Sequence, residues 1–348
     1  MTAAAGEPAT AQRMRSGVDR RPQSLAFAGL MPITVVGSIA FDAVKTPFGE
    51  RERMLGGAAV HFALAASFFD VVRMVGPVGD DFGESELDVL RSRGIDVSDI
   101  EHVHGGRTFF WRGEYGWDLN SRETLDTQLG VFEHFAPSLS GASRASEVLF
   151  LANIQPDLQR AVRAQCQDTR FAALDSMNLW IDVARDSLID AINEVDCLIL
   201  NDAELRQLTA KPNLLSAAQE VLSWRAAGGG CVVAKLGAYG AALITPDGYF
   251  SIPAFPLETV VDPTGAGDSF AGGFVGYIAS QPPGSRLTAA LLRRAMAYGT
   301  AIASFNVEAF GTERVACLTL AEITTRVAEL RRMTSFSVER PARVRGGR

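Results

Sequence analysis

The residues best suited to chemistry lie in one short run, Val261-Asp262-Pro263-Thr264-Gly265-Ala266-Gly267-Asp268-Ser269-Phe270. Pro263 restricts one backbone angle, whereas glycines allow conformations that other residues avoid. The apolar, small-residue stretch that follows predicts a helix whose first turn is this run. N–H groups in a first turn have no helical partner, and the helix dipole adds partial positive charge there. We therefore expect the N–H groups of Gly265, Ala266 and Gly267 to form an anion hole, most commonly for phosphate.

Asp268 places a carboxylate directly beside this expected anion site. A carboxylate weakens a site that only binds anions, so its presence indicates proton removal from a nucleophile next to a phosphoryl group. The alternative is structural, because a Gly-rich turn followed by Asp is commonly a tight turn whose Asp caps a helix. Spacing alone leaves both interpretations open.

Further polar residues stand at or just after short apolar runs that predict buried parallel strands. They are Asp42, Asn153, Asn201, Glu204 and Lys235. Open α/β sheets bind ligands at the carboxyl ends of their strands. Asp42 is therefore a candidate for accepting hydrogen bonds from substrate hydroxyls, although Asp also forms turns. Asn201 with Glu204 is also the pattern of a helix cap followed by a first-turn acid.

A helix predicted over residues 58–69 follows Gly56 and Gly57 and carries His61. A histidine on an apolar helix is more often a satisfied core residue than a functional one. Both interpretations of His61 stay open at this point.

Extended stretches interrupt the alternation of strands and helices. Residues 107–115 are aromatic, and residues 124–132 are rich in threonine and apolar residues. Together with residues 43–54, the segment 107–132 predicts a small β-sheet lid. We expect Phe110 or Trp111 either to stack on a sugar face or a base, or to pack the underside of the lid.

The run from Asp262 to Phe270 resembles the C-terminal signature of the ribokinase-like (PfkB) family of sugar and nucleoside kinases, and the order of the other motifs agrees over roughly residues 33 to 330. The resemblance implies an α/β fold, a ribokinase-like three-layer α/β/α sandwich with a mostly parallel central sheet and a small β-sheet lid. It places this domain at residues 31–333. It also implies a possible homodimer through the lid.

The resemblance also implies roles for the residues above. Asp268 would be the catalytic base, and the substrate would be bound by Asp42, Gly56, Gly57, His61 and Asn153, where His61 replaces an Asn of the family. The ATP site would consist of Asn201, Glu204, Lys235, Gly237, Gly240 and Thr264. Glu204 would act on Mg²⁺ through water, and Asp262 would help to form a monovalent-cation site in members that use K⁺.

The expected function is transfer of the γ-phosphoryl group of ATP to a hydroxyl of a small sugar, with Mg²⁺ required. Two alternatives stay open for the acceptor, a nucleoside and a cyclitol such as inositol. An alternative of another class is a non-catalytic sugar- or nucleotide-binding regulator on the same fold. The motifs of P-loop, dinucleotide-binding and hydrolase sites do not occur in the sequence.

Composition sets further bounds. A net charge of −7 argues against nucleic acid as the main partner. No apolar run is long enough to predict a membrane span, and the four widely spaced cysteines predict reduced core residues in a cytoplasmic protein. Residues 1–30 and the basic tail 334–348 are aperiodic and predicted to be disordered, with Met31 as a candidate start.

Overall fold

The computed structural model describes residues 32–225 and 229–337 of the chain. The predicted N-terminal extension, Met31 and residues 338–348 of the predicted tail lie outside these ranges. The strands are β1 (Ile33–Val36), β2 (Ala40–Thr46), β3 (Gly49–Gly56), β4 (Val72–Val78), β5 (Ile100–His102), β6 (Phe109–Tyr115), β7 (Arg122–Gln128), β8 (Val148–Leu151), β9 (Phe171–Asp175), β10 (Cys197–Asn201), β11 (Cys231–Lys235), β12 (Ala241–Thr245) and β13 (Gly248–Ile252).

The helices alternate with these strands along most of the chain. They are α1 (Ala58–Ala66), α2 (Glu84–Ser92), α3 (Gly141–Arg144), α4 (Pro156–Gln165), α5 (Asn178–Val183), α6 (Arg185–Asn193), α7 (Asp202–Thr209), α8 (Leu214–Ser223), α9 (Ala266–Ala279), α10 (Ala289–Asn306), α11 (Glu313–Cys317) and α12 (Leu320–Thr334). Two short 3₁₀ helices are η1 (Gly130–His134) and η2 (Gly237–Tyr239).

A nine-stranded sheet forms the centre of the molecule, in the order β13-β12-β11-β10-β9-β8-β1-β4-β5. Neighbouring strands from β11 to β5 are parallel, and β12 and β13 add an antiparallel hairpin at one edge. Parallel strands buried on both faces need apolar residues at successive positions, which is why β1 and β8 are continuous apolar runs. The carboxyl ends of the parallel strands meet along one edge, where ligands bind in such sheets.

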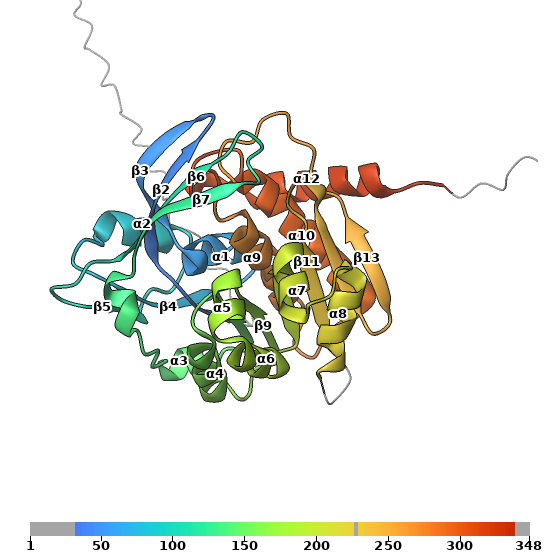
Figure 1. Cartoon of the computed structure of the whole chain (residues 1–348), viewed down its shortest axis with the longest axis horizontal. Coiled ribbons are helices and arrows are strands. Elements are labelled where there is room, and N and C mark those ends of the chain that lie inside the picture. The colour runs from blue at the N-terminus through green and yellow to red at the C-terminus, as the bar shows by residue number, and fades with distance from the viewer. Residues whose placement is uncertain (1–31, 226–228, 338–348) are drawn as a thin grey trace, which may run out of the picture.

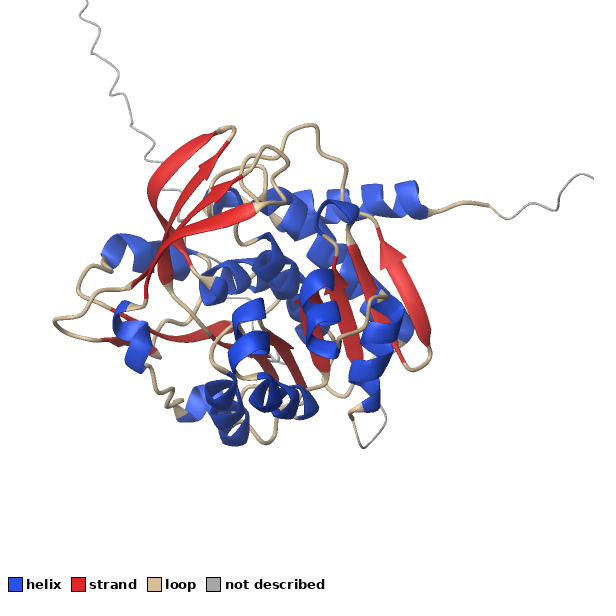
Figure 2. Cartoon of the chain, viewed as in Figure 1, coloured by secondary structure: helices blue, strands red, loops and turns tan. Residues whose placement is uncertain are grey.

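Helices cover both faces of this sheet, so the molecule has three layers (Figure 2). Alternate residues of one strand face the two layers, as in β1, where Val35 packs with α1, α9 and α10 and Val36 packs with α4 to α8 on the other side. The predicted fold class is confirmed. None of the helices in the described ranges combines the length and apolarity needed to cross a lipid bilayer.

A separate four-stranded sheet forms the lid, in the order β3-β2-β6-β7 (Figure 1, upper left). It is built from residues 40–56 and 109–128, close to the predicted segments. The lid contacts the body through a small cluster in which Val44 and Tyr115 pack with Phe310.

Two local predictions were wrong. The extended stretch predicted over residues 124–132 ends at Gln128, because Gly130 has a φ of 53° and its backbone lies against the carbonyl of Arg107 as η1 begins. Cys317 is exposed at the end of α11, so it is not a core residue, whereas the other three cysteines are buried.

Glycines let α9 pack closely between α1 and α10. A Cβ atom at Gly272 would lie 2.3 Å from the backbone oxygen of Phe62 in α1, and one at Gly273 would lie 2.9 Å from the Cα atom of Gly299 in α10. The helix that carries Asp268 is therefore held by backbone contacts on two sides, and its position depends on the absence of side chains there.

We predict that Gly272→Ala lowers the free energy of unfolding by about 1–3 kcal/mol, because the added methyl group would overlap α1. Gly→Ala inside a helix ordinarily raises it by about 0.5–1 kcal/mol. Gly141→Ala is the matched control, since a Cβ atom at Gly141 would meet no atom within 4 Å. Urea denaturation measures both variants. A Gly272→Ala protein as stable as wild type would contradict the packing described.

Candidate active site

The run 261–270 forms a turn that leads into α9. Gly265 is the N-cap, with a φ of 73°, and Asp268 is the third residue of the helix. The Ala266 N–H donates to the carbonyl of Pro263 at 3.2 Å, so it is already used within the turn. The N–H groups of Gly265 and Gly267 make no hydrogen bond with any described residue. Of the three groups in the predicted anion hole, these two remain available to a ligand.

Buried side chains fix this turn. Asp262 is fully buried, and its two carboxylate oxygens accept from the N–H groups of Thr264 and Gly311, each at 2.9 Å. Asn306 at the end of α10 donates to the carbonyl of Thr264 at 2.7 Å and accepts from the hydroxyl of Ser269 at 2.9 Å. The turn is therefore tied both to the loop before α11 and to α10.

His61 lies beneath the turn and is 2% exposed. Its Nδ1 is 3.2 Å from Oδ1 of Asn306, and a Cβ atom at Gly265 would lie 2.2 Å from the same nitrogen. Burial lowers the pKa of His61 to about 4, against the opposing effect of the Asn306 contact, so the ring is neutral at pH 7. This packing explains why position 265 needs glycine. It also means that the His61 ring packs behind the turn and holds Gly265 in position.

The Asp268 carboxylate lies among other charged groups. Burial raises its pKa to about 7, the charges of Asp175 and Asp42 act in the same direction, and Lys235 opposes them. A carboxyl group with a pKa near 7 can accept a proton at neutral pH and release it again. This is the behaviour required of a general base.

Lys235 at the end of β11 and Asp175 at the end of β9 form an ion pair with an Nζ–Oδ2 distance of 2.8 Å. Burial lowers the pKa of Lys235, but the charges of Asp175, Glu204 and Asp268 outweigh it and raise the pKa above its usual value. A Cβ atom at Gly267 would lie 3.2 Å from the ammonium group, so Lys235 reaches the tip of α9. Sequence reasoning missed Asp175, although its place at a strand's carboxyl end was a signal.

Asp42 reaches the site from the lid strand β2 and is 6% exposed. Burial raises its pKa to about 7, opposed by the N–H of Gly57, and the charge of Asp262 raises it further. A Cβ atom at Gly56 would lie 2.0 Å from Oδ2 of Asp42, and one at Gly57, where φ is 95°, would lie 2.4 Å from the carbonyl oxygen of Ser38. Gly56 is therefore required by its packing against Asp42, and Gly57 is required by its positive φ and its packing against the backbone of Ser38.

Asn201 and Glu204 form a capping box at the start of α7. The Asn201 Oδ1 accepts from the Glu204 N–H at 2.7 Å, and Glu204 Oε2 accepts from the Asn201 N–H at 2.9 Å. Burial raises the pKa of Glu204, and its carboxylate still acts on Lys235. Glu204 Oε1 makes no hydrogen bond with a described residue, so the helix cap leaves it available.

The remaining predicted site residues lie farther along the edge of the sheet that is formed by the carboxyl ends of its strands. The Asn153 Oδ1 accepts from the indole N–H of Trp180 at 3.0 Å, which links the end of β8 to α5. Gly240 has a φ of 100°, and a Cβ atom there would lie 2.1 Å from the carbonyl of Ile252. Gly237, with a φ of 57°, begins η2.

Lid residues also reach the site, and sequence reasoning missed them. The Tyr115 hydroxyl lies 3.2 Å from the Thr264 hydroxyl, so β6 contacts the turn before α9. Arg122, opposite Tyr115 on β7, is close enough for its charge to act on Asp42 and Glu204. Asn120 lies near Gly237, since a Cβ atom on that glycine would be 3.5 Å from its Oδ1. The available signal in the sequence was that Tyr115 and Arg122 stand at the adjoining ends of two predicted extended stretches.

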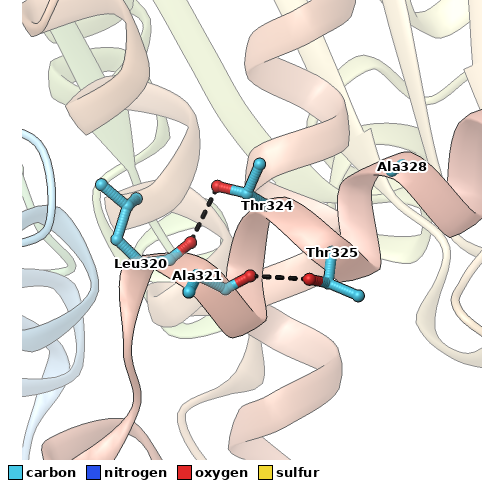
Figure 3. A pocket seen from close by; sticks show the side chains of 5 residues that line it. All are labelled: Leu320, Ala321, Thr324, Thr325 and Ala328. Carbon is cyan, nitrogen blue, oxygen red and sulfur yellow. Dashed lines mark hydrogen bonds between the residues drawn. The ribbon is translucent and has the colours of Figure 1, made fainter.

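A hollow on the outer side of α12 is a separate feature (Figure 3). It is lined by Leu320, Ala321, Thr324, Thr325 and Ala328. The Thr324 and Thr325 hydroxyls donate to the carbonyls of Leu320 and Ala321, one turn earlier. None of these lining residues is charged, and the hydroxyl protons of Thr324 and Thr325 are used within the helix, so the hollow does not compete with the site above.

The raised pKa values make stability depend on pH. A carboxyl group with a pKa of 3.8 when unfolded and about 7 when folded binds more protons in the folded state between these values. The free energy of unfolding therefore falls as pH rises through that window. We predict that Asp42→Asn reduces the fall between pH 5 and pH 7 by about 2 kcal/mol.

Urea denaturation at the two pH values measures this change. Asp186→Asn, which alters an exposed acid in the first turn of α6, is the control and should keep the wild-type pH dependence. An Asp42→Asn protein with the wild-type pH dependence would show that Asp42 does not titrate as described.

Comparisons with known proteins agree with this geometry. The pfkB family carbohydrate kinase model matches residues 25–317. The chain is 28% identical to the cytidine kinase of Thermococcus kodakarensis over 73% of its length and 91% of that protein, and 27% identical to the nucleoside kinase of Methanothermobacter thermautotrophicus over 81% and 91%.

Solved structures share the fold. The nucleoside kinase of Methanocaldococcus jannaschii, an archaeal member of the ribokinase family, superposes with a TM-score of 0.70 at 21% identity, covering 87% of this chain and 100% of that one. Arabidopsis thaliana ribokinase, complexed with ribose and ATP, gives a TM-score of 0.68 at 20% identity over 86% and 99%. With a family match over most of its length and this fold, the chain belongs to the pfkB family of carbohydrate kinases, phosphotransferases that act on a hydroxyl group.

Proposed function

We propose that the protein transfers the γ-phosphoryl group of ATP to a hydroxyl of a small sugar. The observation that carries the proposal is the Asp268 carboxylate, whose pKa burial raises to about 7, on the first turn of α9 beside the unbonded N–H groups of Gly265 and Gly267. A proton acceptor and an anion site in contact suit phosphoryl transfer, in which an alcohol must lose a proton next to a phosphate.

The chemistry proceeds as an in-line displacement. Asp268 takes the proton of the acceptor hydroxyl as its oxygen forms a bond to the γ-phosphorus. The bond from that phosphorus to the bridging oxygen breaks, and its electron pair leaves with ADP. The N–H groups of Gly265 and Gly267 donate to the equatorial oxygens, where negative charge is concentrated during transfer.

Asp42 orients the acceptor. Its buried carboxyl group stands at the lid side of the site, where it accepts hydrogen bonds from sugar hydroxyls beside Gly56 and Gly57. The second candidate acceptor is the ribose of a nucleoside, favoured by the likeness to proteins named cytidine kinase and nucleoside kinase. In that case Phe110 or Trp111, which are half-buried and face opposite sides of β6, would stack on the base.

Metal ions complete the proposal. Mg²⁺ is commonly bound by one or two carboxylates together with substrate phosphates, and Glu204, with one oxygen unbonded, fits that use. When bound, Mg²⁺ neutralises phosphate charge. Asp262 is buried, its pKa is raised by that burial, and it forms no ion pair with a described residue, a situation that an adjacent K⁺ ion would relieve.

We predict that Asp268→Asn folds normally and loses about 10²–10⁴-fold in kcat, because it removes the general base. Steady-state kinetics and a thermal melt measure the two properties, and Asp186→Asn serves as the first-turn control. Turnover within a few-fold of wild type in Asp268→Asn would remove Asp268 from this role.

The wild-type enzyme should also lose kcat/KM on the acid side of about pH 7. Burial and the charge of Asp175 raise the pKa of Asp268 to about 7, and only the ionised carboxylate accepts the proton. We expect the profile to approach a tenfold fall per pH unit below that pKa. A flat profile between pH 5 and 7 would contradict the assignment.

A panel of acceptors tests the function as a whole. ADP release from MgATP is measured with ribose, fructose, inositol, cytidine and adenosine, each in KCl and in choline chloride. We expect acceptor-dependent turnover with a sugar or a nucleoside and a higher rate in KCl. If no acceptor raises ADP release above its rate without acceptor, the regulator alternative is favoured.

A further inference from the structure

The lid ends in a polar cross-strand pair at the active site. Tyr115 on β6 and Arg122 on β7 are direct partners in the antiparallel register. The Tyr115 hydroxyl contacts the Thr264 hydroxyl at 3.2 Å, three residues before Gly267. Directly opposite residues on one face of an antiparallel pair lie about 5 Å apart, so Arg122 is held next to the turn that binds phosphate in the proposed function.

The Arg122 guanidinium is a cation that forms no ion pair with a described residue. It makes no contact within 4 Å with a carboxylate of the described residues, and it lies 5.4 Å from the ring centre of Trp111. Its side chain is exposed, in contrast to that of Lys235, which is 19% exposed. The guanidinium also lies close enough to donate a hydrogen bond to the Tyr115 hydroxyl, and its remaining N–H groups are available to an anion.

Negative charges outnumber positive charges around the turn that precedes α9, so an additional cation would be stabilised there. Carboxylates dominate the site, namely Asp42, Asp175, Glu204, Asp262 and Asp268. Lys235 is the basic residue at the tip of α9, but Asp175 holds its ammonium group at 2.8 Å. Burial raises the pKa of both Asp42 and Glu204, and the charge of Arg122 opposes that effect in each. Arg122 therefore acts on the acceptor side and the ATP side of the site at once.

We propose that Arg122 is a catalytic residue of the lid, which binds the γ-phosphoryl group between Asp42 and Glu204 when the Tyr115 hydroxyl is docked on Thr264. This inference rests on the proposed use of ATP as the donor. The guanidinium donates to γ-phosphoryl oxygens while the new bond to the acceptor oxygen forms and the bond to the β-phosphate oxygen breaks. Asp268 takes the acceptor proton, and the electron pair leaves on ADP.

Binding of two nucleotides that differ in the γ-phosphoryl group tests the proposal without an acceptor. Calorimetry measures Kd for the magnesium complexes of ADP and of the non-hydrolysable analogue AMPPNP. We expect Arg122→Met to raise the ratio of Kd for AMPPNP to Kd for ADP by at least about fivefold, because only AMPPNP carries the third phosphate. A smaller change in this ratio overturns the proposal.

Arg112→Met is the matched control. Arg112 lies on the neighbouring lid strand, its guanidinium is 5.9 Å from the ring centre of Phe110, and it forms no ion pair with a described residue. We expect it to leave the ratio unchanged, and an equal change in both variants would also overturn the proposal.

Turnover with an acceptor from the panel gives a second readout. Arg122→Met should lower kcat by about 10²–10³-fold, the usual cost of removing one donor to developing charge. Added guanidinium ion should restore part of this loss in Arg122→Ala but not in Asp268→Asn. Wild-type kcat in Arg122→Met together with an inactive Asp268→Asn would refute the role of Arg122 and leave the proposed function standing.

Discussion

The site depends on one electrostatic arrangement, a carboxylate held at the positive end of a helix. The N-terminus of α9 favours negative charge, yet Asp268 shares this place with Asp175 and Asp42, and burial with their charges raises its pKa to about 7. Lys235 lies against Gly267 and opposes that rise. The balance keeps Asp268 able to take up a proton at neutral pH, which is the property that phosphoryl transfer to an alcohol needs.

The rest of the fold holds this arrangement in place. Backbone contacts at Gly272 and Gly273 fix α9 against α1 and α10. Asp262 ties the preceding turn to the loop before α11, Asn306 ties it to α10, and the neutral ring of His61 fills the space behind Gly265. A general base must keep its distance to the substrate within a fraction of an ångström, so rigidity of this kind supports function.

The local sequence was sufficient to predict the central sheet, the lid and the start of α9. Apolar strand runs and the glycines around Asp268 are patterns that can be recognised within about ten residues. The local sequence was insufficient for contacts between distant segments. Asp175 and Lys235 are 60 residues apart and meet because β9 and β11 both flank β10. Tyr115 and Arg122 were hidden in an aromatic, threonine-rich stretch, and their role depends on how the lid docks. The capping box confirms that Asn201 and Glu204 cap α7, and it leaves one carboxylate oxygen of Glu204 available for the role proposed for it.

The most direct test of the central claim is a crystal structure of the protein with Mg²⁺ and AMPPNP. The account predicts that the terminal phosphate lies about 3 Å from the Gly265 and Gly267 nitrogens. The Asp268 carboxylate should face the side of that phosphate from which an acceptor hydroxyl approaches. A terminal phosphate bound away from the N-terminus of α9 would contradict the account.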